Sequence, residues 1–289
     1  MIKSILVPAT GKDTDAVGFA AALPIARAFA AHIDALHVRV DPVEVAVAMS
    51  TEGSGGVLLE GLIEDITRDA DAGENKARSG FVEFCVREGL SLAEAPGGAE
   101  AKPSAQFHVE TGQEARWMAV YGMTSDVIVA SRGKPGDDAV ARSTLEALLL
   151  ETGRPLLIPG YSPAQSAVAE RIAVAWKPTP QAARAVALAV PFLAHAKQVA
   201  VLTVEEEEGR RDDADRLVRY FAWHGVRASA ERLAPGPGGA AETLLAAARA
   251  KADLLVMGGY GHTRLREWVF GGFTQRVLTE SPVTVLMAH

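Results

Sequence analysis

The chain has 289 residues, of which 48% are apolar and 22% are charged, a balance that excludes wholesale disorder. Its net charge of −7 argues against nonspecific binding to nucleic acid or to an anionic membrane surface. The length suits two ordinary domains, and no stretch approaches the roughly 20 apolar residues that a membrane-spanning helix requires.

The single cysteine, Cys85, excludes an intrachain disulfide. The first residues carry too short an apolar run for a signal peptide, so the simple expectation is a reducing, cytoplasmic location. Cys85 lies in a stretch with helical spacing, which favours a small buried apolar residue over a reactive thiol.

In chain order, the first half alternates short apolar runs with helical patterns. The predicted strands cover 2–8, 35–38, 107–109, 126–130 and 155–159, and the predicted helices cover 16–31, 58–89, 112–121 and 144–150. The acidic and glycine-rich stretch 41–56 predicts a mobile loop, and 93–103 predicts a surface loop.

The same order then starts again. The predicted strands cover 171–175, 199–204, 227–231, 254–257 and 283–287, and the predicted helices cover 179–196, 212–223, 242–249 and 274–280. Three pairs recur at one offset of 127 residues: Asp126 and Asp253, Gly112 and Gly239, and Pro155 and Pro282. Pro24 and Pro191, which both interrupt the first helix, are 167 apart, so the first half contains 167 − 127 = 40 extra residues.

Strands that alternate with helices predict an α/β fold in each half: an open parallel sheet with helices on both faces. We expect a first domain over 1–160, with the inserted loop and helix near 41–90, and a second over 168–289. Such sheets bind ligands beyond the carboxyl ends of their strands, where the strand order changes direction.

Glycines gather after the apolar run 254–257. Gly258 and Gly261 allow positive φ and close approach of a ligand, and Gly271 and Gly272 precede Thr274, the expected N-cap of the next helix. Free N–H groups and the positive dipole end at a helix start favour a phosphate. Strand-to-helix turns also use glycine without any ligand, so this alternative stays open.

The spacing Gly258-x2-Gly261-x9-Gly271 resembles the nucleotide-phosphate motif of the universal stress protein family, and 258–267 resembles tandem members of that family. The family places Ser or Thr after the third glycine, whereas this chain has Gly272 there. The resemblance implies an adenine-nucleotide α-hydrolase-like fold, with five strands per half in the order 3-2-1-4-5. It also implies pairing of the halves through their last strands, near 156–158 and 284–286.

The resemblance further implies a cytoplasmic regulator that binds ATP or ADP, with Mg²⁺ as an optional bridge and with self-association as a dimer. The stretch that would hold the phosphates comprises Gly258, Gly261, His262, Gly271, Gly272, Phe273 and Thr274. His262 could reach a phosphate or remain in solvent.

Two further positions belong to the implied site. Lys177 stands where the family has Asp or Asn beside the ribose, and an ammonium cannot accept ribose hydroxyl hydrogen bonds. It could bind a phosphate or point to solvent. Val204 matches the place where the family's backbone meets the adenine, although it could equally be sheet core.

The first half lacks the motif. At the offset of 127, Ser131, Lys134 and Thr144 replace the three glycines, which predicts a structural half and one nucleotide site per chain. Arg132 and Lys134 could still attract an anion there, so a ligand in the first half stays an open alternative. No catalytic motif stands out and no histidine spacing predicts a metal site, so we expect no enzyme. Two alternatives stay open: an interaction module that binds no nucleotide, and a weak ATP-hydrolysing enzyme.

Overall fold

In the computed structural model, the described residues are 1–50, 56–94, 102–132, 139–160, 169–205, 213–259, 274, 277 and 281–289. Their strands are β1 Ser4–Pro8, β2 His32–Arg39, β3 Ser91–Leu92, β4 Ser104–Thr111, β5 Val127–Val129, β6 Leu156–Ile158, β7 Arg171–Ala175, β8 Gln198–Val204, β9 Ala228–Leu233, β10 Leu254–Gly258 and β11 Thr284–Ala288. Their helices are α1 Thr14–Phe29, α2 Pro42–Ser50, α3 Gly56–Glu88, α4 Glu114–Met123, α5 Ala139–Glu151, α6 Pro180–Leu193, α7 Asp213–Trp223 and α8 Gly239–Lys251.

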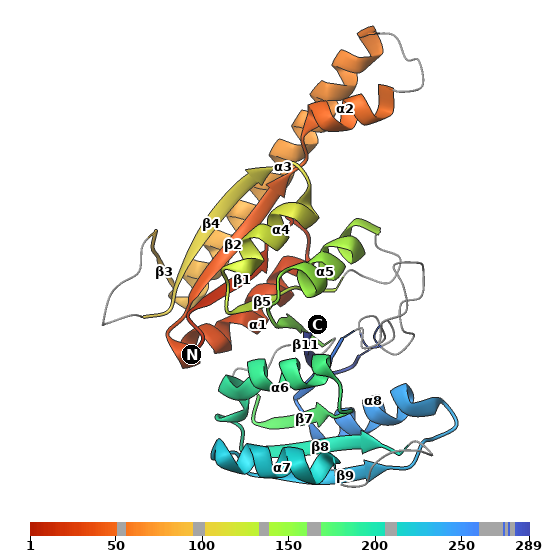
Figure 1. Ribbon diagram of the computed structural model, residues 1–289. Helices are drawn as coiled ribbons and strands as arrows, with labels where there is room; N and C mark the ends of the chain where they lie inside the picture. The colour runs from red at the N-terminus through yellow and green to blue at the C-terminus, as the bar shows by residue number, and fades with distance from the viewer. Residues whose placement is uncertain are drawn as a thin grey trace.

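The strands join into one sheet in the order β3-β4-β2-β1-β5-β6-β11-β10-β7-β8-β9. Leaving out the two-residue β3, each half has the order 3-2-1-4-5 that the family resemblance implies, and the strands within each half run parallel. The prediction of two sheets is wrong in one respect, because the sheets merge into one (Figure 1).

The merger occurs between the last strands of the halves. β6 and β11 pair antiparallel, with Leu157 opposite Leu286. Nearby, the Arg132 side chain donates to the Ser281 carbonyl at 2.8 Å. A Cβ on Gly160 would lie 2.7 Å from the Pro282 carbonyl oxygen, so only glycine fits this close approach. The halves therefore share backbone pairing and side-chain contacts.

The core forms one layer on each face of the sheet. Helices α1, α3, α6 and α7 cover one face, and α4, α5 and α8 cover the other. Along β1, Ile5 and Val7 belong to the first layer and Leu6 to the second. This alternation explains why the central strands read as continuous apolar runs: both of their faces are buried.

The segment after β2 differs from its prediction. Instead of a loop over 41–56, the chain forms helix α2, while residues 51–55 lie outside the described part of the chain. The Asp41 carboxylate accepts hydrogen bonds from the backbone N–H groups of Val43 and Glu44, and Pro42 occupies the first helical position. The Asp-Pro pair is a typical start of a helix, but the acidic and glycine-rich composition of 41–56 led to the prediction of a loop.

Helix α3 matches its prediction closely, and its early turns project with α2 beyond the ends of β2 and β4 (Figure 1). Cys85 on α3 is buried, and burial raises the pKa of its thiol to about 11, as expected for a core residue.

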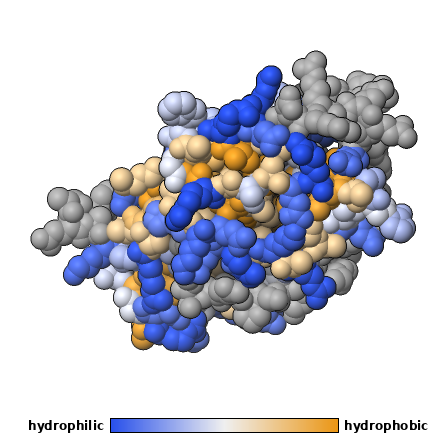
Figure 2. Space-filling model, turned by 90° about the horizontal axis from the view of Figure 1, so that it is seen from below, coloured by the Kyte–Doolittle hydropathy of each residue, from blue (hydrophilic) through white to orange (hydrophobic). Residues whose placement is uncertain are grey.

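Seen from the β9 end, apolar residues form an area surrounded by hydrophilic ones (Figure 2). Within the described residues, no helix has the length and hydropathy needed to cross a membrane.

Candidate functional site

Three of the expected site residues lie at neighbouring carboxyl ends of strands. Gly258 ends β10, Lys177 follows β7 by two residues, and Val204 ends β8. Because β10, β7 and β8 are consecutive in the sheet, these positions share one edge. The strand order changes direction between β10 and β7, which is the ligand-binding place of such sheets.

Gly258 has a different structural role from the one expected. Its φ is not positive, so the prediction that it bends the backbone in this way is wrong. A Cβ on Gly258 would lie 2.6 Å from the Ala182 nitrogen and 2.7 Å from the Gln181 carbonyl carbon. Glycine is required here because the first turn of α6 packs directly on the end of β10.

Helix α6 begins beside the end of β10, and its first residues are those typical of a helix N-terminus. Thr179 is the N-cap, and its hydroxyl accepts a hydrogen bond from the Ala182 N–H at 3.2 Å. Pro180 occupies the first helical position, where its missing N–H costs nothing. The positive end of the α6 dipole therefore lies at the same edge as Gly258.

Lys177 and Val204 have contrasting surroundings. Lys177 is exposed, whereas Val204 is half-buried, pairs with Leu233 of β9 and packs against the core layer under α8. The Val204 side chain thus serves the sheet core, and only its main chain reaches the strand end.

Thr274 is only 6% exposed and is itself helical, so it does not occupy the N-cap position that the sequence predicted. Its burial comes from tertiary packing, which its sequence neighbours do not reveal. Gly261, His262, Gly271, Gly272 and Phe273 lie outside the described residues.

Sequence reasoning missed a group of buried polar atoms near the same edge. Trp176 Nε1, Thr203 Oγ1 and Gln181 Oε1 are buried and have no hydrogen-bond partner within the part of the chain that the structure describes. Ala175 pairs with Leu202, which places Trp176 beside Thr203 on the face that carries α6. No sequence pattern marks these residues, because their burial depends on how α6 packs on the sheet.

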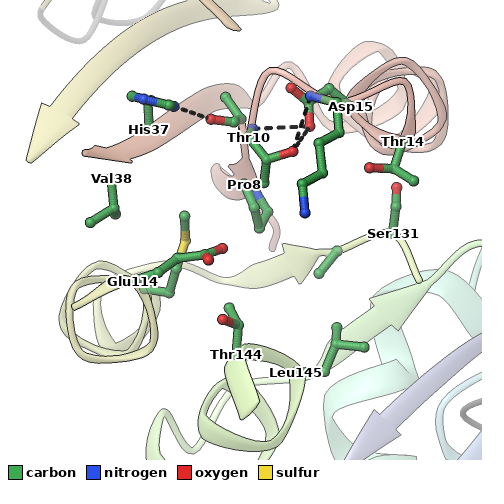
Figure 3. Close-up of a pocket in the computed structure, with 14 residues that line it drawn as sticks. Pro8, Thr10, Thr14, Asp15, His37, Val38, Glu114, Ser131, Thr144 and Leu145 are labelled. Atoms are coloured by element: carbon green, nitrogen blue, oxygen red, sulfur yellow. Dashed lines mark hydrogen bonds between the residues drawn. The ribbon is translucent and has the colours of Figure 1, made fainter. Parts of the chain in front are cut away.

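The first half, expected to be purely structural, contains a pocket of about 170 Å³ at the carboxyl ends of β1, β2 and β5 (Figure 3). Ser131 and Thr144, which stand at the positions of Gly258 and Gly271, both line it. Lys134, the counterpart of Gly261, lies outside the described residues. Among the residues described, no group of three or more His, Cys, Asp or Glu side chains is placed to hold a metal ion.

A family comparison identifies the second half. Residues 169–289 match the universal stress protein family. These residues form a universal stress protein domain. The matched segment begins just before β7 and runs to the end of the chain, so it contains all the glycines of the candidate phosphate motif.

Solved structures match almost the whole chain. A universal stress protein from Archaeoglobus fulgidus aligns with a TM-score of 0.70 at 14% identity, covering 99% of this chain and 95% of that one. A putative universal stress protein from Pseudomonas aeruginosa aligns with a TM-score of 0.56 at 15% identity, covering 99% and 93%. At such identities the likeness establishes the fold, here a tandem arrangement. No curated protein matches the chain.

Proposed function

We propose that the protein is a regulator that binds one adenine nucleotide, ATP or ADP, in its second half. The observation that carries the proposal is the match of residues 169–289 to the universal stress protein family, together with a glycine spacing that resembles the family's phosphate motif. The switch point between β10 and β7, at which Gly258 and Lys177 lie, supports it.

In this proposal the chain divides into domains 1–160 and 168–289. The phosphates are held by the stretch made of Gly258, Gly261, His262, Gly271, Gly272, Phe273 and Thr274. Because Gly258 packs on α6, its contribution is the shape of the strand end. The main chain at Val204 meets the base, and the Lys177 ammonium contacts a phosphate rather than the ribose.

The proposed protein works in the cytoplasm, self-associates and acts as a regulator rather than as an enzyme. Mg²⁺ is an optional companion of the nucleotide, and holding it would require only one or two carboxylates from the protein beside the phosphates. Two other functions compete: an interaction module without nucleotide, and slow ATP hydrolysis at the same site.

The first test is to denature freshly purified protein and to identify any released nucleotide by chromatography and mass. We expect ATP or ADP close to one per chain, and saturating Mg-ATP should raise the melting temperature of nucleotide-free protein. Ligand at 100 times its Kd adds about 2.7 kcal/mol to the free energy of unfolding. Release of no nucleotide, together with an unchanged melt, would favour the interaction module.

A pair of variants locates the site. Gly261→Val should abolish nucleotide binding while the fold survives, because a β-branched side chain obstructs a phosphate-binding turn. Gly61→Val is the matched control, since nothing lies within 4 Å of a Cβ added at Gly61 on α3. Equal affinity of both variants for ATP would contradict the assignment of the phosphate stretch. Formation of ADP from ATP by wild-type protein, lost in Gly261→Val, would indicate an enzyme.

A further inference from the structure

The pocket of the first half has the features of a ligand site, although this half lacks the glycine motif. It lies where the strand order changes direction between β1 and β5. Its lining side chains come from the loop after β1, from the ends of β2 and β5, and from α1, α4 and α5 (Figure 3). Ligands of open α/β sheets bind at this place.

The loop that borders the pocket is held in place by hydrogen bonds. The Asp15 carboxylate accepts from the Thr10 N–H at 3.0 Å, from the Thr10 hydroxyl at 2.8 Å and from the Gly11 N–H at 2.7 Å. Gly11 has φ of +76°, and a Cβ there would lie 2.7 Å from the Gly73 carbonyl oxygen of α3. The pocket is therefore pre-formed, which lowers the entropic cost of binding.

Three polar groups that line the pocket have no hydrogen-bond or ion-pair partner among the described residues. The half-buried Glu114 carboxylate accepts no hydrogen bond from any described residue, and the Lys12 ammonium makes no ion pair or hydrogen bond in the same part of the chain. The Ser131 hydroxyl oxygen is buried and also has no partner. Lys12 is exposed and its ammonium is free to reach a ligand, whereas the Glu114 carboxylate and the Ser131 hydroxyl are at least half-buried. Because unpaired buried polar groups are costly, a ligand that pairs with Glu114 and Ser131 gains binding energy.

The electrostatics at Glu114 agree with this geometry. Burial raises the pKa of the Glu114 carboxyl, the Lys12 charge opposes that rise, and the Asp15 charge adds to it. Opposite charges thus act on the same pocket. A lone anion would meet Glu114 and Asp15, and a lone cation would meet Lys12, whereas a ligand with both charges has a partner for each.

The remaining walls are apolar, from Val38, Met118 and Leu145 among others. A volume of about 170 Å³ lies below the roughly 300–1,000 Å³ of sites for drug-sized ligands. A nucleoside triphosphate is too large for this volume and carries charge of the same sign as Glu114 and Asp15, whereas a small molecule with an ammonium group and one short apolar chain suits both.

We propose that this pocket binds a small zwitterion of the aliphatic α-amino acid class. The ligand ammonium donates to the Glu114 carboxylate, the ligand carboxylate pairs with the Lys12 ammonium, and the aliphatic chain lies against the apolar walls. This inference concerns the first half alone and does not depend on a nucleotide site in the second half.

The test uses the full-length protein and three probes that share one aliphatic body. L-leucine carries both charged groups, 3-methylbutylamine carries only the ammonium, and 4-methylpentanoate carries only the carboxylate. Ligand-observed NMR and calorimetry measure their affinities. We expect leucine to bind at least about tenfold more tightly than either single-charge analogue, because each charged group adds a charge-assisted hydrogen bond.

Two nearly isosteric variants separate the ends of the ligand. Glu114→Gln should weaken the binding of leucine and the amine by about tenfold and should not weaken that of the carboxylate, while Lys12→Met should weaken the binding of leucine and the carboxylate. The matched controls are Glu83→Gln and Lys102→Met, which change exposed residues outside the pocket. Melting curves verify that all four variants fold.

No saturable binding of leucine, valine or alanine to wild-type protein would overturn the proposal. Equal affinity for leucine and both analogues would overturn it too, as would an equal loss in the control variants. If ATP displaced leucine, and if Glu114→Gln changed the ATP concentration needed for this displacement, the pocket would be assigned to a nucleotide instead. Because Gly261→Val leaves the pocket intact, leucine binding should persist in that variant even if nucleotide binding disappears.

Discussion

The two halves share a strand order but differ where the first helix meets the fourth strand. In the second half the glycine lies on the strand, at Gly258, and the backbone of Gln181 and Ala182 packs against it. In the first half the glycine lies on the helix, at Gly18, where a Cβ would be 3.2 Å from the Ser131 hydroxyl oxygen of the strand end. A glycine thus lies at the contact between the first helix and the fourth strand in both halves, but Gly18 meets the strand end about one turn further along its helix than Gln181 and Ala182 do.

This exchange changes what each strand end offers to a ligand. At the end of β10, Gly258 is covered by the backbone at the start of α6, whereas Ser131 at the end of β5 supplies a hydroxyl to the pocket that Glu114 and Lys12 also line. The two strand ends therefore present different groups, because the sheet is set by core packing and the loops at its edge are free to differ.

The largest expected effect tests whether the halves behave as one body. Leu157 and Leu286 are 4% and 0% exposed and pair directly across the junction. Leu157→Ala and Leu286→Ala should each lower the free energy of unfolding by about 2–5 kcal/mol. Denaturant titrations measure the change in the free energy of unfolding. The reactivity of the buried Cys85 thiol toward a thiol reagent measures how often the first half opens. If Leu286→Ala left Cys85 reactivity unchanged, the halves would unfold independently.

The next effect concerns the exchanged glycines. Gly258→Ala should lower the free energy of unfolding by about 1–3 kcal/mol or more, because the new methyl group meets backbone that cannot rotate away. Gly18→Ala should cost less, since it meets the movable side chains of Ser131 and Val7. Ser131→Ala should be nearly neutral, because it removes a hydroxyl that has no partner among the described residues. Equal losses at Gly258 and Gly18 would contradict this distinction.

In the first half, Asp34, His32 and His108 form a polar cluster on the face of the sheet that α4 covers. Burial alone would raise the pKa of Asp34, but hydrogen bonds from His108 and His32 outweigh it and hold the pKa well below its usual range. The equivalent place on β8 has Ala200. Because the folded pKa lies below the unfolded value of about 3.9, Asp34 stabilises the fold above about pH 4, and this contribution is lost as the pH falls.

Asp34→Asn should therefore flatten the fall in stability below about pH 4 and cost about 1–3 kcal/mol at neutral pH. Urea titrations at several pH values measure both quantities. A variant that keeps the full acid sensitivity of the wild type would show that other carboxylates determine it.

The smallest effect compares Asp126 and Asp253, which hold the first strand of each half. Asp126 accepts from the backbone N–H of Lys3 at 2.6 Å, and Asp253 accepts from that of Arg171 at 3.1 Å. Asp253 also pairs with the Arg171 guanidinium at 2.6 Å. Asp126→Ala should cost about 0.5–1.5 kcal/mol. Asp253→Ala should lower the free energy of unfolding by more than Asp126→Ala does in dilute buffer. This difference should become smaller as added salt screens the ion pair between Asp253 and Arg171. Identical salt dependence would contradict this difference.

The internal repeat explains how much of the fold was predictable. Asp126 and Asp253, which are 127 residues apart in the sequence, each accept a hydrogen bond from the backbone at the start of the first strand of their half. The sequence repeat therefore identified structurally equivalent positions. Apolar runs located nearly all strands, because parallel strands are buried on both faces. Helix α2 was missed, since the Asp41-Pro42 cap lies beside a stretch whose composition predicts a loop.

The sequence by itself determined the α/β class, the tandem order and the place of the glycine motif, because these depend on local periodicity and spacing. Only the tertiary structure decided that Gly258 packs on α6 rather than bending the chain, and that Glu114, Lys12 and Ser131 meet in one pocket. These residues are far apart in the chain. Their proximity follows from the strand order of the sheet, which brings loops from distant segments to one edge.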